Sequence, residues 1–145
     1  MITFKKTHTV PYSANAMYDL VNDIESYSKF LPWCQSATIH AKSQTDLEAT
    51  LVIHASGFTQ TLTTKNTMVP GEKIHIRLVK GPLSHLEASW VFEPCDATSC
   101  LIHFEIQFEF SNSLVRMALE PMFNKISQTI MEAFLSRAKE IYSPI

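Results

Sequence analysis

The sequence predicts an α+β fold in which a bent antiparallel sheet wraps around a long C-terminal helix. Two observations predict it. From about residue 35 to 110 apolar residues recur with period two, and from about 113 to 142 they recur with period 3.6. One-sided alternation on consecutive strands is typical of an antiparallel sheet with one buried and one wet face. At 145 residues the chain is expected to form a single domain spanning residues 1–145.

The start of the chain predicts one strand followed by two short helices. Residues 4–10 alternate as a strand. Ser13 can cap a helix that carries Met17 and Leu20, and Asp23 can cap a second, shorter one.

A turn follows the second helix and is unusually apolar, reading Tyr27-Ser-Lys-Phe-Leu-Pro-Trp-Cys34. Pro32 prevents the helix from continuing and favours an extended Leu31. Turns normally lie at the surface and are polar. This one therefore either caps a core or lines the mouth of a cavity.

The middle of the chain predicts about six strands. The clearest covers Cys100 to Phe110, where every second residue is apolar, and Pro70-Gly71 and Gly81-Pro82 mark turns between earlier strands. Further apolar stripes fall on Leu47, Ala49, Leu51, Ile53 and Ala55, on Ile74, Ile76 and Leu78, and on Leu86, Ala88, Trp90 and Phe92.

The last segment predicts a helix long enough to cross the whole sheet. Asn112 or Ser113 can cap its start. Roughly 30 residues at 1.5 Å each give about 45 Å of helix. Pro121 removes one backbone hydrogen bond and is expected to kink it.

Composition excludes several classes of protein. Net charge is −2 and the pI about 6.3, which argues against DNA binding through a broad basic surface. No stretch approaches the roughly 18 apolar residues that span a bilayer, and the N-terminus lacks a secretory pattern. Three cysteines without a C-x-x-C pair suggest free thiols. We expect a cytoplasmic protein, with peripheral contact at the inner membrane as an alternative.

Catalytic and metal-binding patterns are missing from the sequence. The six histidines are scattered, with none two or four residues from another, so no metal site is expected. There is no G-x-S-x-G, and three glycines do not make a phosphate-binding loop. We therefore expect no enzyme and no catalytic residues. What remains is an interior rich in aromatic residues and methionine, for which composition alone favours a closed core over a cavity.

Several segments together resemble a known family. They are Val10-Pro-Tyr-Ser-Ala with Met17-Tyr-Asp-Leu-Val-Asn-Asp, Tyr27 to Cys34, Phe58-Thr-Gln-Thr-Leu-Thr-Thr-Lys-Asn, Gly81-Pro-Leu with Trp90-Val-Phe, Phe108-Glu-Phe, and Ala133-Phe with Arg137-Ala-Lys-Glu. In order and spacing the chain is similar to the RatA and coenzyme Q-binding (ubiquinone-binding) branch of the START-like SRPBCC, or polyketide cyclase/dehydrase-like, superfamily. It departs from the family at Pro121 and at Leu83, where many relatives have Phe.

The resemblance implies a helix-grip fold: a curved seven-stranded antiparallel sheet around a long C-terminal helix, two short N-terminal helices, and a hydrophobic cavity between sheet and helix. It also implies two alternative roles. One is non-enzymatic binding of ubiquinone or a related isoprenoid quinone, which supports cellular respiration. The other is a RatA-type toxin that binds the large ribosomal subunit and blocks subunit association. Because mitochondrial members carry a presequence, the chain is expected to be bacterial.

We favour quinone binding as the function. The sequence suggests which residues would line the cavity, form its mouth or contact the ribosome. The cavity lining should include Trp33, Phe58, Leu62, Leu78, Leu86, Trp90, Met122, Ile126 and Ile130, and its mouth Phe30, Leu31, Pro32, Gly81, Pro82 and Leu83. Ribosome contact would use Lys65, Lys73 and Arg77. No cofactor is required; a bound ubiquinone or other isoprenoid lipid is the expected small molecule, with transient membrane contact during its transfer.

Overall fold

A computed structural model describes residues 1–142 of the chain. Its elements, in chain order, are β1 (Ile2–Val10), α1 (Ala14–Asn22), a 3₁₀ turn η1 (Ile24–Ser26), α2 (Tyr27–Phe30), β2 (Cys34–Lys42), β3 (Asp46–Ala55), β4 (Phe58–Val69), β5 (Lys73–Lys80), β6 (Leu83–Asp96), β7 (Ser99–Phe110) and α3 (Ser113–Tyr142). The α+β class, the two short N-terminal helices and the long C-terminal helix are confirmed.

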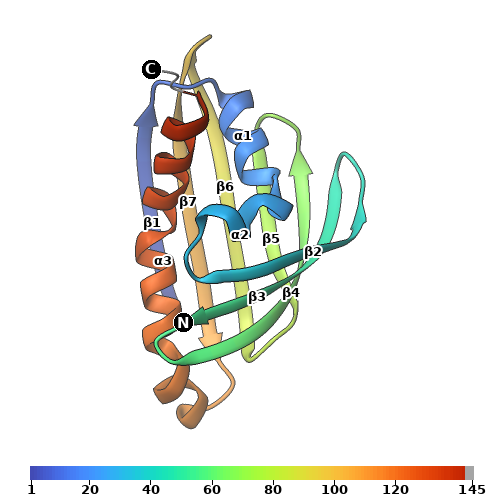
Figure 1. Cartoon of the computed structure of the whole chain (residues 1–145), viewed down its shortest axis with the longest axis vertical. Coiled ribbons are helices and arrows are strands. Elements are labelled where there is room, and N and C mark those ends of the chain that lie inside the picture. The colour runs from blue at the N-terminus through green and yellow to red at the C-terminus, as the bar shows by residue number, and fades with distance from the viewer. Residues whose placement is uncertain (143–145) are drawn as a thin grey trace.

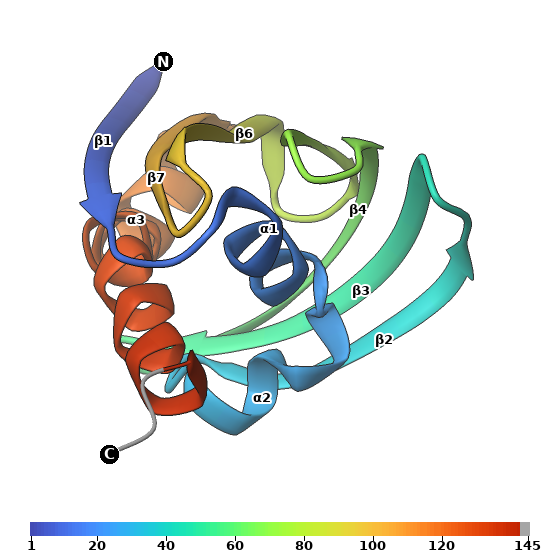
Figure 2. The same cartoon turned by 90° about the horizontal axis from the view of Figure 1, so that it is seen from above.

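The strands form one seven-stranded antiparallel sheet in the order β1-β7-β6-β5-β4-β3-β2. Each strand from β2 to β7 pairs with its neighbour in sequence, and β1 joins the far side of β7. The sheet is strongly curved, with α1 and α3 on its concave side, as Figure 2 shows. In Figure 1, α3 runs lengthwise beside β1 and β7. This is the curved sheet around a C-terminal helix that the family resemblance implies.

Two of the expected helix caps are present. The Ala16 amide donates to Ser13 Oγ at 3.1 Å, and the Val115 amide donates to Asn112 Oδ1 at 2.9 Å. Asp23 precedes η1, but its carboxylate accepts from the Ser26 hydroxyl at 2.6 Å and makes no cap hydrogen bond. Asp23 therefore occupies the expected N-cap position, but its side chain bonds the Ser26 hydroxyl and no backbone amide.

The helix α3 continues through Pro121, which lies on its exposed side. Its buried side faces the sheet through Leu119, Met122, Phe123, Ile126, Ser127, Met131, Phe134 and Ala138. The kink expected at Pro121 stays a prediction.

The apolar turn after α2 is tied to the elements on both sides of it. Leu31 is extended, with φ −91° and ψ 109°, as Pro32 predicts, and it is 1% exposed. The Trp33 carbonyl accepts from the His54 amide of β3 at 2.8 Å. Tyr27 donates its hydroxyl to the Val21 carbonyl of α1. These hydrogen bonds hold the turn in place between the sheet and the N-terminal helices.

Aromatic rings fill much of the space between α3 and the sheet. Trp90 of β6 packs against Phe104 at 4.4 Å and against Phe134 of α3 at 5.2 Å between ring centroids. Tyr27 and Phe30 each contact Phe134 at 5.4 Å. Tyr27, Trp90, Phe104 and Phe134 of this cluster also border a cavity between α3 and the sheet.

Candidate functional site

The candidate site is an apolar cavity of about 110 Å³ between α3 and the concave face of the sheet. Strands β3 to β7 supply one wall, α3 supplies the other, and Ile24, Tyr27 and Trp33 close it from the segment around α2. The cavity exists because β6 places small residues such as Ala88 next to Trp90 on this face, and β3 contributes Ala49.

Six of the nine residues expected to line the cavity border it: Trp33, Leu62, Leu86, Trp90, Ile126 and Ile130. The other three lie elsewhere. Phe58 begins β4 and is 40% exposed, since it follows the tight turn at Gly57. Leu78 lies half-buried on β5, and Met122 is fully buried on α3.

None of the residues expected at the mouth borders the cavity. Leu31 and Leu83 are buried in the core. Phe30 packs on Phe134, and the Arg137 guanidinium lies 5.2 Å from the centre of the Phe30 ring. Pro32 and Gly81 are exposed and Pro82 is half-buried.

Gly81 touches the cavity indirectly, through Leu62. A Cβ at position 81 would lie 2.7 Å from Leu62 Cδ2 and 3.1 Å from Leu78 Cδ1. Any larger residue at position 81 would therefore have to displace the end of the Leu62 side chain.

Three buried polar side chains border the cavity in addition to the apolar ones. Asn66 and Thr64 come from β4, and Ser127 comes from α3. The period-two pattern of apolar residues does not reveal them, because they are polar. Asn66 lies two and four residues from Thr64 and Leu62, so the period-two pattern of β4 places it on the inward face. A polar residue at an inward position of a strand is unusual, and this could have identified Asn66 as a candidate site residue from the sequence.

The cavity lacks the groups needed for acid–base chemistry. Among its described lining residues Tyr27 is the one with a titratable side chain, and burial raises the pKa of its hydroxyl far above its ordinary value. No group of three His, Cys, Asp or Glu side chains within residues 1–142 is placed to hold a metal ion. The arrangement can enclose an apolar molecule and offer it a few hydrogen bonds.

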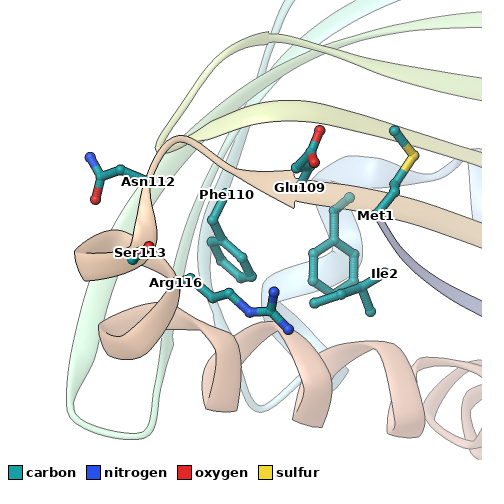
Figure 3. Close-up of a pocket in the computed structure, with 8 residues that line it drawn as sticks. Met1, Ile2, Glu109, Phe110, Asn112, Ser113 and Arg116 are labelled. Atoms are coloured by element: carbon teal, nitrogen blue, oxygen red, sulfur yellow. The ribbon is translucent and has the colours of Figure 1, made fainter.

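A second hollow, of about 240 Å³, lies between the start of α3 and the strands β1 and β7. Figure 3 shows Arg116 reaching from α3 toward Ile2 across it. Arg116 pairs with Glu120 at 2.7 Å, and this hydrogen bond lowers the pKa of the Glu120 carboxyl. The hollow is larger than the cavity, but its lining is mixed polar and apolar, whereas the lining of the cavity is mostly apolar, so the cavity suits an apolar ligand better.

The three basic residues expected at a ribosome contact lie on β4 and β5. Lys65 and Arg77 are directly opposite each other, and Lys73 is exposed at the start of β5. Glu48 of β3 is opposite Lys65, and Glu87 of β6 is opposite Arg77. Carboxylates therefore flank the basic pair on both sides.

Comparison with known proteins identifies the family. Residues 10–135 match the family described as polyketide cyclase / dehydrase and lipid transport. The chain belongs to this family. Its relatives include the ribosome association toxin RatA of Escherichia coli K12, 37% identical over 99% of this chain and 90% of that protein. The toxin of the same name from Pseudomonas aeruginosa is 34% identical over 95% of this chain and 96% of that one.

Within the polyketide cyclase family the chain lies on the branch that contains RatA and the coenzyme Q-binding proteins. The mitochondrial coenzyme Q-binding protein COQ10 of Drosophila melanogaster is 26% identical over 97% of this chain and 60% of that protein.

Solved structures confirm the fold. The Zhui aromatase/cyclase from a Streptomyces species superposes with a TM-score of 0.84 at 19% identity, covering 95% of this chain and 93% of that one. A START superfamily protein from Mycobacterium smegmatis gives 0.79 at 19% identity, with 96% and 98% covered. No helix within residues 1–142 is long and apolar enough to cross a membrane.

Proposed function

We propose that the chain binds a hydrophobic small molecule without catalysing a reaction, and that the ligand is ubiquinone or a related isoprenoid quinone. The observation that carries the proposal is the apolar cavity between α3 and the sheet. Burial at about 25 cal/mol per Å² of apolar surface can hold such a ligand without any catalytic group. The coenzyme Q-binding relative supports the choice of quinone. A carrier of this kind would act in the cytoplasm and contact the inner membrane transiently.

The size of the cavity defines how such a ligand would bind. Ligand pockets usually measure about 300–1,000 Å³, whereas an engineered cavity of about 150 Å³ holds benzene. At about 110 Å³, the cavity suits a single ring. The isoprenoid tail would then need α3 to move away from the sheet, or would lie along the outside.

Tryptophan fluorescence tests the proposal directly. Trp33 and Trp90 are the two tryptophans of the chain, and both border the cavity. Titration with decylubiquinone should give saturable quenching. Lipids extracted from the protein purified from its native host should include a quinone by mass spectrometry. A protein without extractable quinone or saturable quenching would contradict the proposal.

A cavity-filling variant makes the test specific to the site. Ala88→Leu on β6 extends a side chain into the cavity and should weaken decylubiquinone binding at least about tenfold. Overpacking costs about 1–3 kcal/mol, so the fold should survive. Val91→Leu on the same strand is the matched control, because Val91 is 38% exposed on the outer face. Equal binding by both variants would place the ligand outside the cavity.

Association with the large ribosomal subunit is the second candidate function. The observation that favours it is the identity of 34–37% to proteins named ribosome association toxin RatA over nearly the whole chain. Lys65, Lys73 and Arg77 are the proposed contacts. This role would use the outer face of the sheet, so it is compatible with a ligand in the cavity.

A further inference from the structure

The cavity contains buried polar atoms that an apolar ligand alone does not explain. Asn66 Oδ1, Ser127 Oγ and Trp33 Nε1 have no hydrogen-bond partner among the described residues. All three side chains border the cavity, and Asn66 and Ser127 are 3% and 1% exposed. Buried polar groups in proteins are nearly always hydrogen-bonded, so each of these exceptions needs an explanation.

The three atoms come from three different elements. Trp33 precedes β2, Asn66 lies on β4, and Ser127 lies on the α3 side of the cavity. A molecule held between sheet and helix therefore lies against residues of both walls that carry an unpaired polar atom. Unpaired, these groups weaken the fold, because each has lost its water without gaining a partner.

The three polar groups differ in whether they donate or accept hydrogen bonds, and this difference indicates which ligand group would pair with them. An indole N–H can only donate, a carboxamide oxygen can only accept, and a hydroxyl can do both. A ligand hydroxyl has one hydrogen and two lone pairs, so it can accept from Trp33 and Ser127 and donate to Asn66. A ligand carbonyl accepts from Trp33 or Ser127 but has no hydrogen for the Asn66 oxygen.

We propose that the cavity recognises a ring bearing a hydroxyl group, that is, a phenol or hydroquinone, in preference to a plain hydrocarbon ring or one whose oxygens are all carbonyls. This inference rests on the proposed function and deepens it: of the two redox forms of a quinone, the reduced form is the better ligand. No electron transfer is involved, because the preference comes from hydrogen bonding alone.

Three probes of similar size separate the possibilities by calorimetric titration: cyclohexanol, cyclohexanone and methylcyclohexane. The variants are Asn66→Leu and Ser127→Ala, which remove the polar atoms with little change of shape. Ser136→Ala, at an exposed position of α3, is the matched control. For each probe, the dissociation constant of the variant is divided by that of the wild type. Because the free probe is the same in both measurements, its hydration does not affect this ratio.

We expect both cavity variants to weaken cyclohexanol binding roughly tenfold, the usual effect of losing one hydrogen bond to a buried partner. Methylcyclohexane should bind them as tightly as wild type or more tightly. Asn66→Leu should leave cyclohexanone unaffected. The thermal midpoint of ligand-free Ser127→Ala should equal or exceed that of wild type, because the variant removes an unpaired buried group.

Two outcomes would overturn the inference, and they differ in what they leave standing. Equal shifts for all three probes would mean that Asn66 and Ser127 only shape the cavity, and a hydrophobic carrier without hydroxyl preference would remain. If no probe binds and decylubiquinone does not quench, the carrier function fails as well.

Discussion

Trp90 shows how one side chain can serve the core and the cavity together. Its ring contacts Phe92, Phe104 and Phe134 and is 2% exposed, while one part of it borders the cavity. We expect Trp90→Ala to lower the free energy of unfolding by about 3–5 kcal/mol. In a urea titration of this variant, ligand binding and folded structure should be lost at the same urea concentration. A well-folded Trp90→Ala protein that fails only in ligand binding would contradict this and assign the ring to the ligand alone.

Gly81 controls the space available to the ligand through Leu62. In Gly81→Ala the new Cβ would displace the end of Leu62, and the free space beside Leu62 is the cavity. Because a flexible side chain can move, stability should fall by less than about 1 kcal/mol. Decylubiquinone should bind several-fold more weakly in a fluorescence titration.

Gly57→Ala is the matched comparison for Gly81→Ala. Gly57 has a φ of +84° with no heavy atom near the new Cβ, so the strain falls on the backbone. This variant should lose about 1 kcal/mol of stability and keep its ligand affinity. If the two glycine variants behave alike, Leu62 does not limit the cavity.

The buried thiol of Cys100 should make the protein less stable at alkaline pH. Burial, assisted by the nearby charge of Cys95, raises the pKa of its thiol from the ordinary value of 9.0 to about 11. The folded state thus favours the neutral thiol, and this contribution is complete below pH 9 and lost as the pH rises toward 11. In Cys100→Ala, the free energy of unfolding should fall less steeply between pH 9 and 11. Cys95→Ala removes only the smaller of the two causes and should change the slope less than Cys100→Ala does; equal slopes in all three proteins would contradict the assignment.

At the scale of elements, the start of α3 depends on one side chain. Asn112 Oδ1 accepts from the Val115 amide, and its backbone carbonyl accepts from Arg116. Replacing a cap residue by alanine typically costs about 1 kcal/mol. Asn112→Ala should lower the free energy of unfolding by that amount in thermal or urea denaturation. Asn112→Ser should restore most of it, since serine caps as well as asparagine; a full loss in both would mean that the side chain acts in another way.

Strands and helices were largely predictable because burial imposes a period on each. In β7 the period-two pattern of Cys100, Ile102 and Phe104 matches burial along the strand, since the residues between them are only half-buried. The cavity was not predictable in the same way. Periodicity identifies which face Leu86 and Trp90 occupy, but whether facing side chains meet or leave a gap depends on the distance between α3 and the sheet.

The same limit explains the misplaced and missed cavity residues. Met122 lies on the inward face of α3 as its period requires, yet it packs into the core away from the cavity. Phe58 is apolar but begins a strand after a tight turn, where its side chain is partly exposed. Asn66 and Ser127 interrupt apolar stripes with single polar residues, which a search for apolar periodicity passes over.

For the molecule as a whole, the two candidate functions lie on opposite faces of the sheet. In a row across the outer face, Glu48, Lys65, Arg77 and Glu87 are cross-strand neighbours. Reversing the basic charges would line up four carboxylates and destabilise the sheet. Replacing the basic residues by neutral ones is therefore the better way to test ribosome binding.

The triple variant Lys65→Gln, Lys73→Gln, Arg77→Gln should keep its affinity for decylubiquinone within about twofold, because the cavity lies on the other face. If the ribosome contact uses this surface, co-sedimentation with large subunits should fall and its salt dependence should weaken. Neutralising Lys29, Lys125 and Lys139, which are exposed elsewhere, is the control. Loss of quinone binding in the triple variant would show that the two faces are coupled.

The pairing of β1 with β7 has a consequence for how the chain folds during synthesis. The strands β2 to β7 can pair one after another as they leave the ribosome, since each neighbours the next in sequence. The strand β1 is made first, yet it has no partner until β7 is complete, and non-local pairings of this kind form slowly. The helix α3 is made after all seven strands and supplies one wall of the cavity. A nascent chain therefore has no place for a ligand until α3 has been made, which confines loading to the stage after the sheet is complete.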